Sequence, residues 1–185
     1  MEILDYVTVE NLIPKDVCET LIKEIEHKTE WQQHSWYNNQ SASIHSKKTK
    51  ELDILYTFTT PELQTILAPF IQISLDKYLH NIKSDNVGIK TYTPIRFNRY
   101  SKGQVMRRHY DHIHDIFDGD RKGIPILSLV GLLNDDYEGA KMIVRDTEFP
   151  MKRGDIIIMP SVFLYPHEIT ECTKGTRYSW VSWAF

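Results

Sequence analysis

The hydrophobic pattern of the chain changes its period near residue 87, and this change restricts the fold more than any other feature of the sequence. Before residue 87, apolar residues recur at 3- and 4-residue intervals, as they do on one face of an α-helix. After it, short segments rich in β-branched and aromatic residues alternate with turn signals. Helices followed by many short strands predict a mainly β domain with flanking α-helices on one face of a sandwich or barrel.

Two helices are expected in the first part of the chain. Residues 15–28 place apolar side chains at helical spacing behind a proline, and residues 61–79 repeat this pattern. Pro69 conflicts with an unbroken second helix and should kink it or delay its start. Between the helices, residues 32–50 are strongly polar, which indicates a long mobile loop or an irregular hairpin. This stretch, with its Trp36 and Tyr37, is a candidate lid over a peptide or, equally, a disordered connector.

Strands are expected throughout the second part of the chain. The strand-like segments are 91–100, 126–133, 141–145, 155–159 and 177–185. No repeat or linker divides the sequence, so we expect one domain over residues 1–185 with no appended module. Within it, residues 1–86 would supply helical support and a variable loop, and residues 87–185 the β core.

The amino-acid composition indicates in which cellular compartment the protein works and which kinds of partner it binds. The 185 residues are 41% apolar and 25% charged, with 22 Lys and Arg against 25 Asp and Glu, which gives no overall case for nucleic acid binding. No apolar run approaches the ~20 residues of a membrane span, and the N-terminus does not resemble a secretion signal. Cys18 and Cys172 lack metal-type spacing. We therefore expect a reduced, soluble, cytoplasmic protein of undetermined oligomeric state with no membrane partner.

The densest group of potential metal ligands spans residues 109–115. In a strand, His109 and Asp111 point to the same side, and His167, which follows an apolar strand, is a plausible third ligand. Two histidines and one carboxylate form the facial triad of non-haem Fe(II) sites. A solvated polar loop is the alternative interpretation, and His112 and His114 are expected beside the ligands or on the surface.

The order of the motifs around these residues makes the pattern more specific. In sequence order they are Tyr100-x-x-Gly103, His109-x-Asp111, Leu132-Leu133-Asn134, Tyr137-Glu138-Gly139-Ala140, Arg153-Gly154-Asp155, His167 and Gly175-Thr176-Arg177-Tyr178. This order resembles the iron(II)/2-oxoglutarate dioxygenases of the prolyl-4-hydroxylase-like branch, well over residues 90–185 and loosely before them. The resemblance implies a double-stranded β-helix, a cupin-like jelly roll, with both helices outside its larger sheet.

The resemblance also implies a role for several side chains. His109, Asp111 and His167 would bind iron. Arg177 would bind the far carboxylate of 2-oxoglutarate, as suits a planar guanidinium that never loses its charge. Ser179, two residues further along the strand, would reach the same carboxylate, and Tyr100 would line the pocket. The alternatives are a surface position for Arg177 and a core position for Tyr100. Trp183 would lie near the iron or in the core. Met106 departs from the family pattern, since many relatives have an aromatic residue at this position.

The function implied is hydroxylation of a peptidyl residue, with proline the best candidate, and release of succinate and CO2. The cofactors implied are Fe(II), 2-oxoglutarate and O2, with ascorbate as a possible reductant, and the partner is a proline-containing peptide. A nucleobase or small-molecule oxygenase is the first alternative, because a basic run without acids could attract an anionic substrate; its members are Arg96, Arg99, Lys102, Arg107 and Arg108. That run is also consistent with a solvated strand face. The second alternative is a non-catalytic binding module.

Overall fold

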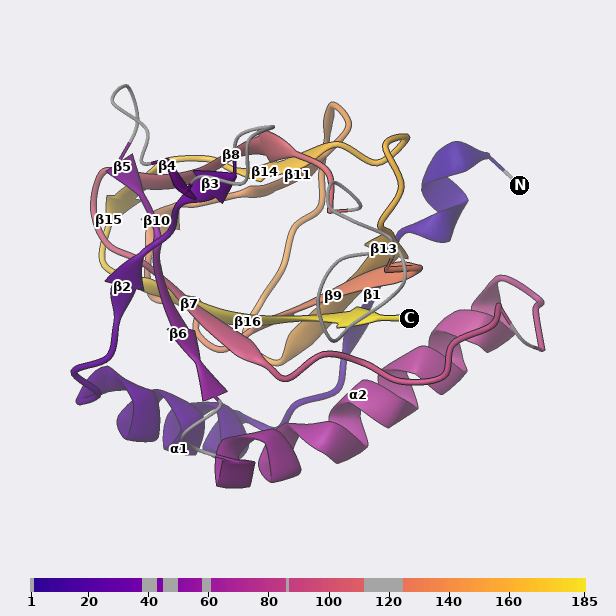
Figure 1. Ribbon diagram of the computed structural model, residues 1–185, viewed down its shortest axis with the longest axis horizontal. Helices are drawn as coiled ribbons and strands as arrows, with labels where there is room; N and C mark the ends of the chain where they lie inside the picture. The colour runs from indigo at the N-terminus through magenta and orange to yellow at the C-terminus, as the bar shows by residue number, and fades with distance from the viewer. Residues whose placement is uncertain (1, 38–42, 45–49, 58–60, 86, 112–124) are drawn as a thin grey trace.

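The computed structural model describes residues 2–37, 43–44, 50–57, 61–85, 87–111 and 125–185. Two sheets face each other, and two helices lie along the outer side of the larger sheet (Figure 1). A short 3-10 helix, η1 (Ile3–Tyr6), precedes the first strand. The architecture is the mainly β domain with flanking helices that the sequence pattern predicts, and it agrees with the jelly roll that the resemblance implies.

The larger sheet has seven strands, and every neighbouring pair is antiparallel. In spatial order they are β1 (Thr8–Asn11), β13 (Asp155–Pro160), β9 (Leu127–Leu132), β16 (Arg177–Ala184), β7 (Arg96–Tyr100), β6 (Asp53–Tyr56) and β2 (Gln32–Gln33). The central strand β16 therefore has β9 on one side and β7 on the other.

The smaller sheet has five strands: β12 (Thr147–Glu148), β11 (Met142–Val144), β14 (His167–Ile169), β8 (Gln104–His109) and β5 (Lys50–Glu51). Two further pairs join β10 (Glu138–Gly139) to β15 (Cys172–Lys174), and β3 (Trp36–Tyr37) to β4 (Ser43–Ile44). The β3–β4 pair confirms the hairpin interpretation of the polar stretch. Its residues 38–42 and 45–49 lie outside the described part of the chain.

The helices are α1 (Lys15–Glu26) and α2 (Pro61–Asn81). The structure contradicts a delayed start of the second helix: α2 begins at Pro61 and continues through Pro69. Proline suits a first helical turn because its missing N–H would have no intrahelical acceptor there. No helix in the described ranges combines the length and the apolar character needed to cross a bilayer.

Two apolar clusters separate the layers of the molecule. Phe97 and Trp180 belong to the cluster between the helices and the larger sheet, whereas Tyr100 and Val181 belong to the cluster between the two sheets. This division follows from the alternation of side chains along a strand. Gly131 lies opposite Trp180, and a Cβ at Gly131 would stand 2.2 Å from the indole ring. The fully buried tryptophan therefore needs glycine at this position.

Candidate metal and cosubstrate site

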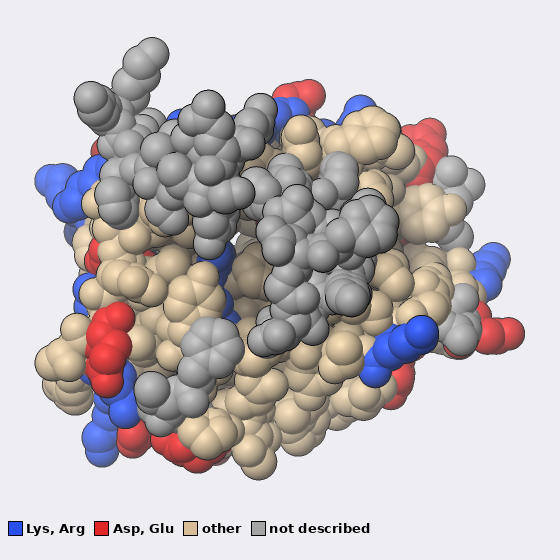
Figure 2. Space-filling model, in the orientation of Figure 1, with Lys and Arg blue, Asp and Glu red and all other residues tan. Residues whose placement is uncertain are grey.

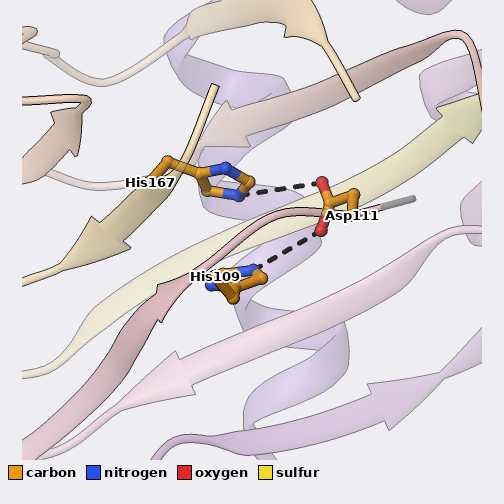
Figure 3. A group of neighbouring side chains, drawn as sticks. All are labelled: His109, Asp111 and His167. Atoms are coloured by element: carbon orange, nitrogen blue, oxygen red, sulfur yellow. Dashed lines mark ion pairs between the residues drawn. The ribbon is translucent and has the colours of Figure 1, made fainter. Parts of the chain in front are cut away.

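The structure brings together the three residues predicted as metal ligands. His109 ends β8, His167 begins β14, and the two are directly paired between these strands. Asp111 follows two residues after His109, and one ligand atom from each of the three residues lies within 4.8 Å of the other two (Figure 3). The solvated-loop alternative is wrong for these residues, whose side chains are at most 11% exposed.

Backbone carbonyls determine which nitrogen of each imidazole faces the centre. Nδ1 of His109 is 2.7 Å from the carbonyl oxygen of Arg107, and Nδ1 of His167 is 3.1 Å from that of Tyr165. Because a carbonyl oxygen only accepts, each Nδ1 carries the hydrogen and each Nε2 presents a lone pair. The two Nε2 atoms face the carboxylate of Asp111 at 3.4 and 3.7 Å, too far for hydrogen bonds of good geometry.

At neutral pH the centre holds an ionised Asp111 carboxylate beside a neutral His167 imidazole. Burial, and then the neighbouring His109, lowers the pKa of His167 to about 4, although Asp111 opposes this shift. Burial also raises the pKa of Asp111, but the two imidazoles and the Ser128 hydroxyl outweigh it and hold that pKa well below its usual range. Ser128 donates to Asp111 Oδ2 over 2.5 Å. Two imidazole nitrogens and a carboxylate fit a divalent cation, and this donor set is the facial triad of Fe(II).

The triad lines a small cavity, partly open to solvent, between the two sheets. The other lining residues are Arg96, Asn98, Tyr100, Met106, Val130, Met142, Ile169, Val181 and Trp183. Trp183 is therefore next to the triad rather than in the core beneath the helices. Tyr100, 2% exposed, also faces this space, where burial raises the pKa of its phenol against the effect of Arg177 and Arg96.

Arg177 is buried in the interior, which rules out the surface alternative. It is 1% exposed, its Nη1 donates to Ser179 Oγ over 2.7 Å, and its guanidinium lies 5.1 Å from the centre of the Tyr100 ring. Its Nε has no hydrogen-bond acceptor, and none of the ion pairs among the described residues includes it. A buried cation in this state favours binding of an anion, as expected for a cosubstrate carboxylate.

The comparison with known families agrees with this geometry. Residues 95–185 match the family model described as the 2OG-Fe(II) oxygenase superfamily. The chain belongs to this superfamily. The matched region begins just before β7 and includes the three ligand candidates together with Arg177 and Ser179.

Among its relatives in the superfamily are PKHD-type hydroxylases. One from Stenotrophomonas maltophilia is 34% identical over 98 residues, covering 50% of this chain and 43% of the relative. One from Delftia acidovorans is also 34% identical, over 99 residues, covering 49% and 42%. The matched regions therefore span less than half of these curated relatives.

Solved structures of prolyl hydroxylases share the fold of this chain. A prolyl hydroxylase from Trichoplax adhaerens, in complex with a hypoxia inducible factor peptide fragment, has a TM-score of 0.73 and 13% identity, covering 98% of this chain and 84% of that one. A prolyl-4-hydroxylase from Pseudomonas putida has a TM-score of 0.67 and 18% identity, covering 96% and 91%. At these identities the likeness concerns the fold alone, and it confirms the double-stranded β-helix.

The basic run of the chain is not one solvated face, as the sequence allowed. Three of its arginines form ion pairs: Arg99 with Asp53, Arg107 with Glu51, and Arg108 with Asp146. Lys102 is exposed, but Arg96 is only 8% exposed and lines the cavity. The solvated-face interpretation is wrong for Arg96. Arg96 and Tyr100 are four positions apart on β7, and side chains an even number of positions apart on a strand share a face. This spacing was the sequence signal for the position of Arg96.

Sequence analysis missed two other contacts of the candidate site. Ser128 on β9 holds Asp111, and the Trp36 ring from β3 meets the His109 ring edge-on, with 5.4 Å between ring centres. Neither residue lies near its partner in the sequence, so no local motif could have indicated these contacts. His112 and His114 lie outside the described residues.

Proposed function

We propose that the chain is an Fe(II)- and 2-oxoglutarate-dependent dioxygenase that hydroxylates a peptidyl residue, namely proline, and releases succinate and CO2. The observation that carries the proposal is the buried guanidinium of Arg177, with its Nε unpaired, on the same inward face of β16 as Val181 and Trp183. A dicarboxylate bound at the triad by one end would bring its other carboxylate to Arg177. Triad proteins without a keto acid cosubstrate would not need this buried cation.

The proposal gives each polar side chain of the site a role. His109, His167 and Asp111 would hold the metal, which supplies O2 activation coupled to decarboxylation of the keto acid. Arg177 and Ser179 would orient the cosubstrate through its far carboxylate. The side chains between the sheets would exclude water from the reacting groups. Ascorbate is proposed as the reductant that keeps the metal ferrous.

The relatives support a peptide substrate. The Trichoplax enzyme was solved with a peptide fragment, and both it and the Pseudomonas enzyme are named as prolyl hydroxylases. The sequence relatives are PKHD-type hydroxylases. We propose a proline-containing peptide as the partner of this chain on that basis.

The test is succinate release by the purified, Fe(II)-loaded chain with 2-oxoglutarate and a proline-rich peptide. The proposal expects peptide-dependent succinate and the addition of one oxygen atom to the peptide, detected by mass spectrometry. A matched peptide with alanine in place of proline and the variant Asp111→Asn are the controls. Succinate release that responds to nucleobases or small molecules instead would favour the first alternative, and a chain that binds no 2-oxoglutarate would be the binding module.

A further inference from the structure

A second buried arginine lines the cavity of the triad, and the proposed binding of metal and cosubstrate does not use it. Arg96 is 8% exposed, and its Nε donates to Asn98 Oδ1 over 3.1 Å. Its guanidinium lies 5.1 Å from the centre of the Trp183 ring. Among the described residues, Asn98 is the one hydrogen-bond partner of the Arg96 side chain, and no carboxylate forms an ion pair with it.

The strand register separates Arg96 from the cosubstrate arginine. On β7, Arg96 lies opposite Val181 and Tyr100 lies opposite Arg177, so the two arginines are four residues apart along the sheet, or roughly 13 Å between their backbones. Trp183, which Arg96 covers, is paired with Ser128, the residue that holds Asp111. Arg96 therefore lines the cavity at the metal, whereas Arg177 lies four residues further along the sheet.

The charges of the loaded site would not balance without a further anion. A dianionic cosubstrate and the Asp111 carboxylate together neutralise a divalent metal and the guanidinium of Arg177. Asp111 and Arg96 are the charged residues among the described side chains that line this cavity, so the charge of Arg96 is left over. An unbalanced cation in a largely desolvated cavity favours an anionic ligand.

We propose that Arg96, positioned by Asn98 and Trp183, is a specificity-determining residue that binds a carboxylate of the primary substrate. The substrate class is then a carboxylate-bearing one: a peptide with an acidic side chain beside the hydroxylated residue, or one that ends in a free carboxylate there. The terminal nitrogens of a guanidinium form the edge that binds a carboxylate in bidentate fashion once Nε is engaged elsewhere. This inference rests on the proposed oxygenase function.

The test is a pair of matched titrations, measured by calorimetry, on protein loaded with Mn(II) and 2-oxoglutarate. N-acetyl-L-proline against N-acetyl-L-prolinamide examines a terminal carboxylate, and N-acetyl-Pro-Glu-amide against N-acetyl-Pro-Gln-amide examines a side-chain carboxylate. We expect the acid of at least one pair to bind at least tenfold more tightly than its amide. Equal binding of acid and amide in both pairs, or no binding of any of the four probes, would overturn the inference without any variant.

Variants then assign the preference to Arg96. Arg96→Gln should bind acid and amide equally, Arg96→Lys should retain part of the preference, and both should keep the dissociation constant for 2-oxoglutarate. Arg99→Gln is the matched control, because Arg99 is on the same strand and pairs with Asp53. A preference that survives in Arg96→Gln, or a tenfold loss of 2-oxoglutarate affinity there, would contradict the inference.

The failure of this inference and that of the proposed function give different results. Peptide hydroxylation with no preference for acids would uphold the oxygenase and reject the role of Arg96. Acid binding that depends on Arg96, without succinate release on any peptide, would uphold the subsite and reject the peptidyl hydroxylase.

Discussion

At the scale of single residues, one local device orients both imidazoles of the triad. In each case Nδ1 contacts the backbone carbonyl two residues earlier in the chain, from Arg107 to His109 and from Tyr165 to His167. The contact that selects the tautomer of each histidine therefore lies within its own segment. The position of Asp111 depends on a different sheet, through Ser128 on β9.

Replacing Ser128 should weaken metal binding while leaving the fold intact. Ser128→Ala removes the hydroxyl that donates a hydrogen bond to Asp111 Oδ2. Replacing a residue that hydrogen-bonds to a metal ligand typically reduces metal affinity about 10- to 100-fold. Mn(II) dissociation constants from electron paramagnetic resonance would measure the effect. Ser182→Ala is a suitable control, since Ser182 is equally buried but bonds to Thr93. An unchanged affinity in Ser128→Ala would show that Asp111 needs no such support.

Replacing Arg177 should impair binding of the cosubstrate but not of the metal. Arg177→Ala should raise the KM for 2-oxoglutarate at least tenfold, because a charge-assisted hydrogen bond contributes on the order of 1.5–3 kcal/mol. Arg177→Lys should recover only part of the loss, since an ammonium keeps the charge without the bidentate geometry. Succinate release against 2-oxoglutarate concentration measures KM, and Mn(II) titration is the control. Unchanged turnover in Arg177→Ala would remove the basis of the cosubstrate assignment.

The metal-free fold should lose stability as the pH falls from about 6.5 to about 4. Burial lowers the pKa of His167 to about 4 in the folded chain, from 6.5 in the unfolded one. Between these values only the unfolded chain binds the proton, so acid favours unfolding, by roughly 3 kcal/mol across the window. Urea denaturation in EDTA at several pH values measures this change. His167→Gln should show a shallower dependence, and an equal slope in both proteins would contradict the assignment.

At the scale of elements, β16 serves two cores at once because its side chains alternate. Arg177, Ser179, Val181 and Trp183 face the smaller sheet, and Trp180 faces the helices. A shift of register by one residue would exchange these faces and move Arg177 out of the interior. The large residues on the helix side therefore help to place the charged residue on the other side.

The contact between β9 and β16 gives a prediction at this scale. Gly131→Ala would place its Cβ 2.2 Å from the Trp180 ring, which is fully buried and has little room to move. Overpacking of this kind typically costs about 1–3 kcal/mol in the free energy of unfolding. Chemical denaturation measures the loss, with Gly103→Ala as the contrast: its Cβ would contact nothing within 4 Å, although its φ of +84° adds backbone strain. A Gly131→Ala protein as stable as wild type would mean that Trp180 can repack.

At the scale of the whole molecule, the candidate metal centre joins the two sheets. Both histidines come from the smaller sheet, whereas Asp111 is fastened to the larger sheet by Ser128. A bound cation would therefore connect layers that otherwise meet through apolar contacts. The polar site and the apolar cluster that contains Tyr100 and Val181 therefore both lie between the two sheets.

Metal binding should consequently stabilise the whole fold. A metal that binds only the folded chain adds about 2.7 kcal/mol to the free energy of unfolding at a concentration 100 times its dissociation constant. The midpoint temperature of unfolding, with Mn(II) and with EDTA, measures this gain. Asp111→Ala should be insensitive to the metal, and an equal gain in that variant would place the binding elsewhere.

The sequence by itself determined the fold class and the three ligand candidates. The change of period near residue 87 separates helices from strands, and His109 and Asp111 share a strand face by spacing alone. These are local properties of the chain, so they can be read without knowledge of distant contacts. The order of motifs added Arg177, Ser179 and Tyr100 through resemblance to a family.

Only the tertiary structure decided which charged and polar residues enter the site. A run of five basic residues has the same appearance in the sequence whether it faces water or the interior, and the structure buries Arg96 while it pairs Arg99 with Asp53 outside the cavity. Likewise, Ser128 and Trp36 reach the ligands from strands far away in the sequence. Whether a polar side chain is buried, and which residue it contacts, depends on which faces of the two sheets meet. The packing of the two sheets decides this, and no single segment of the sequence does.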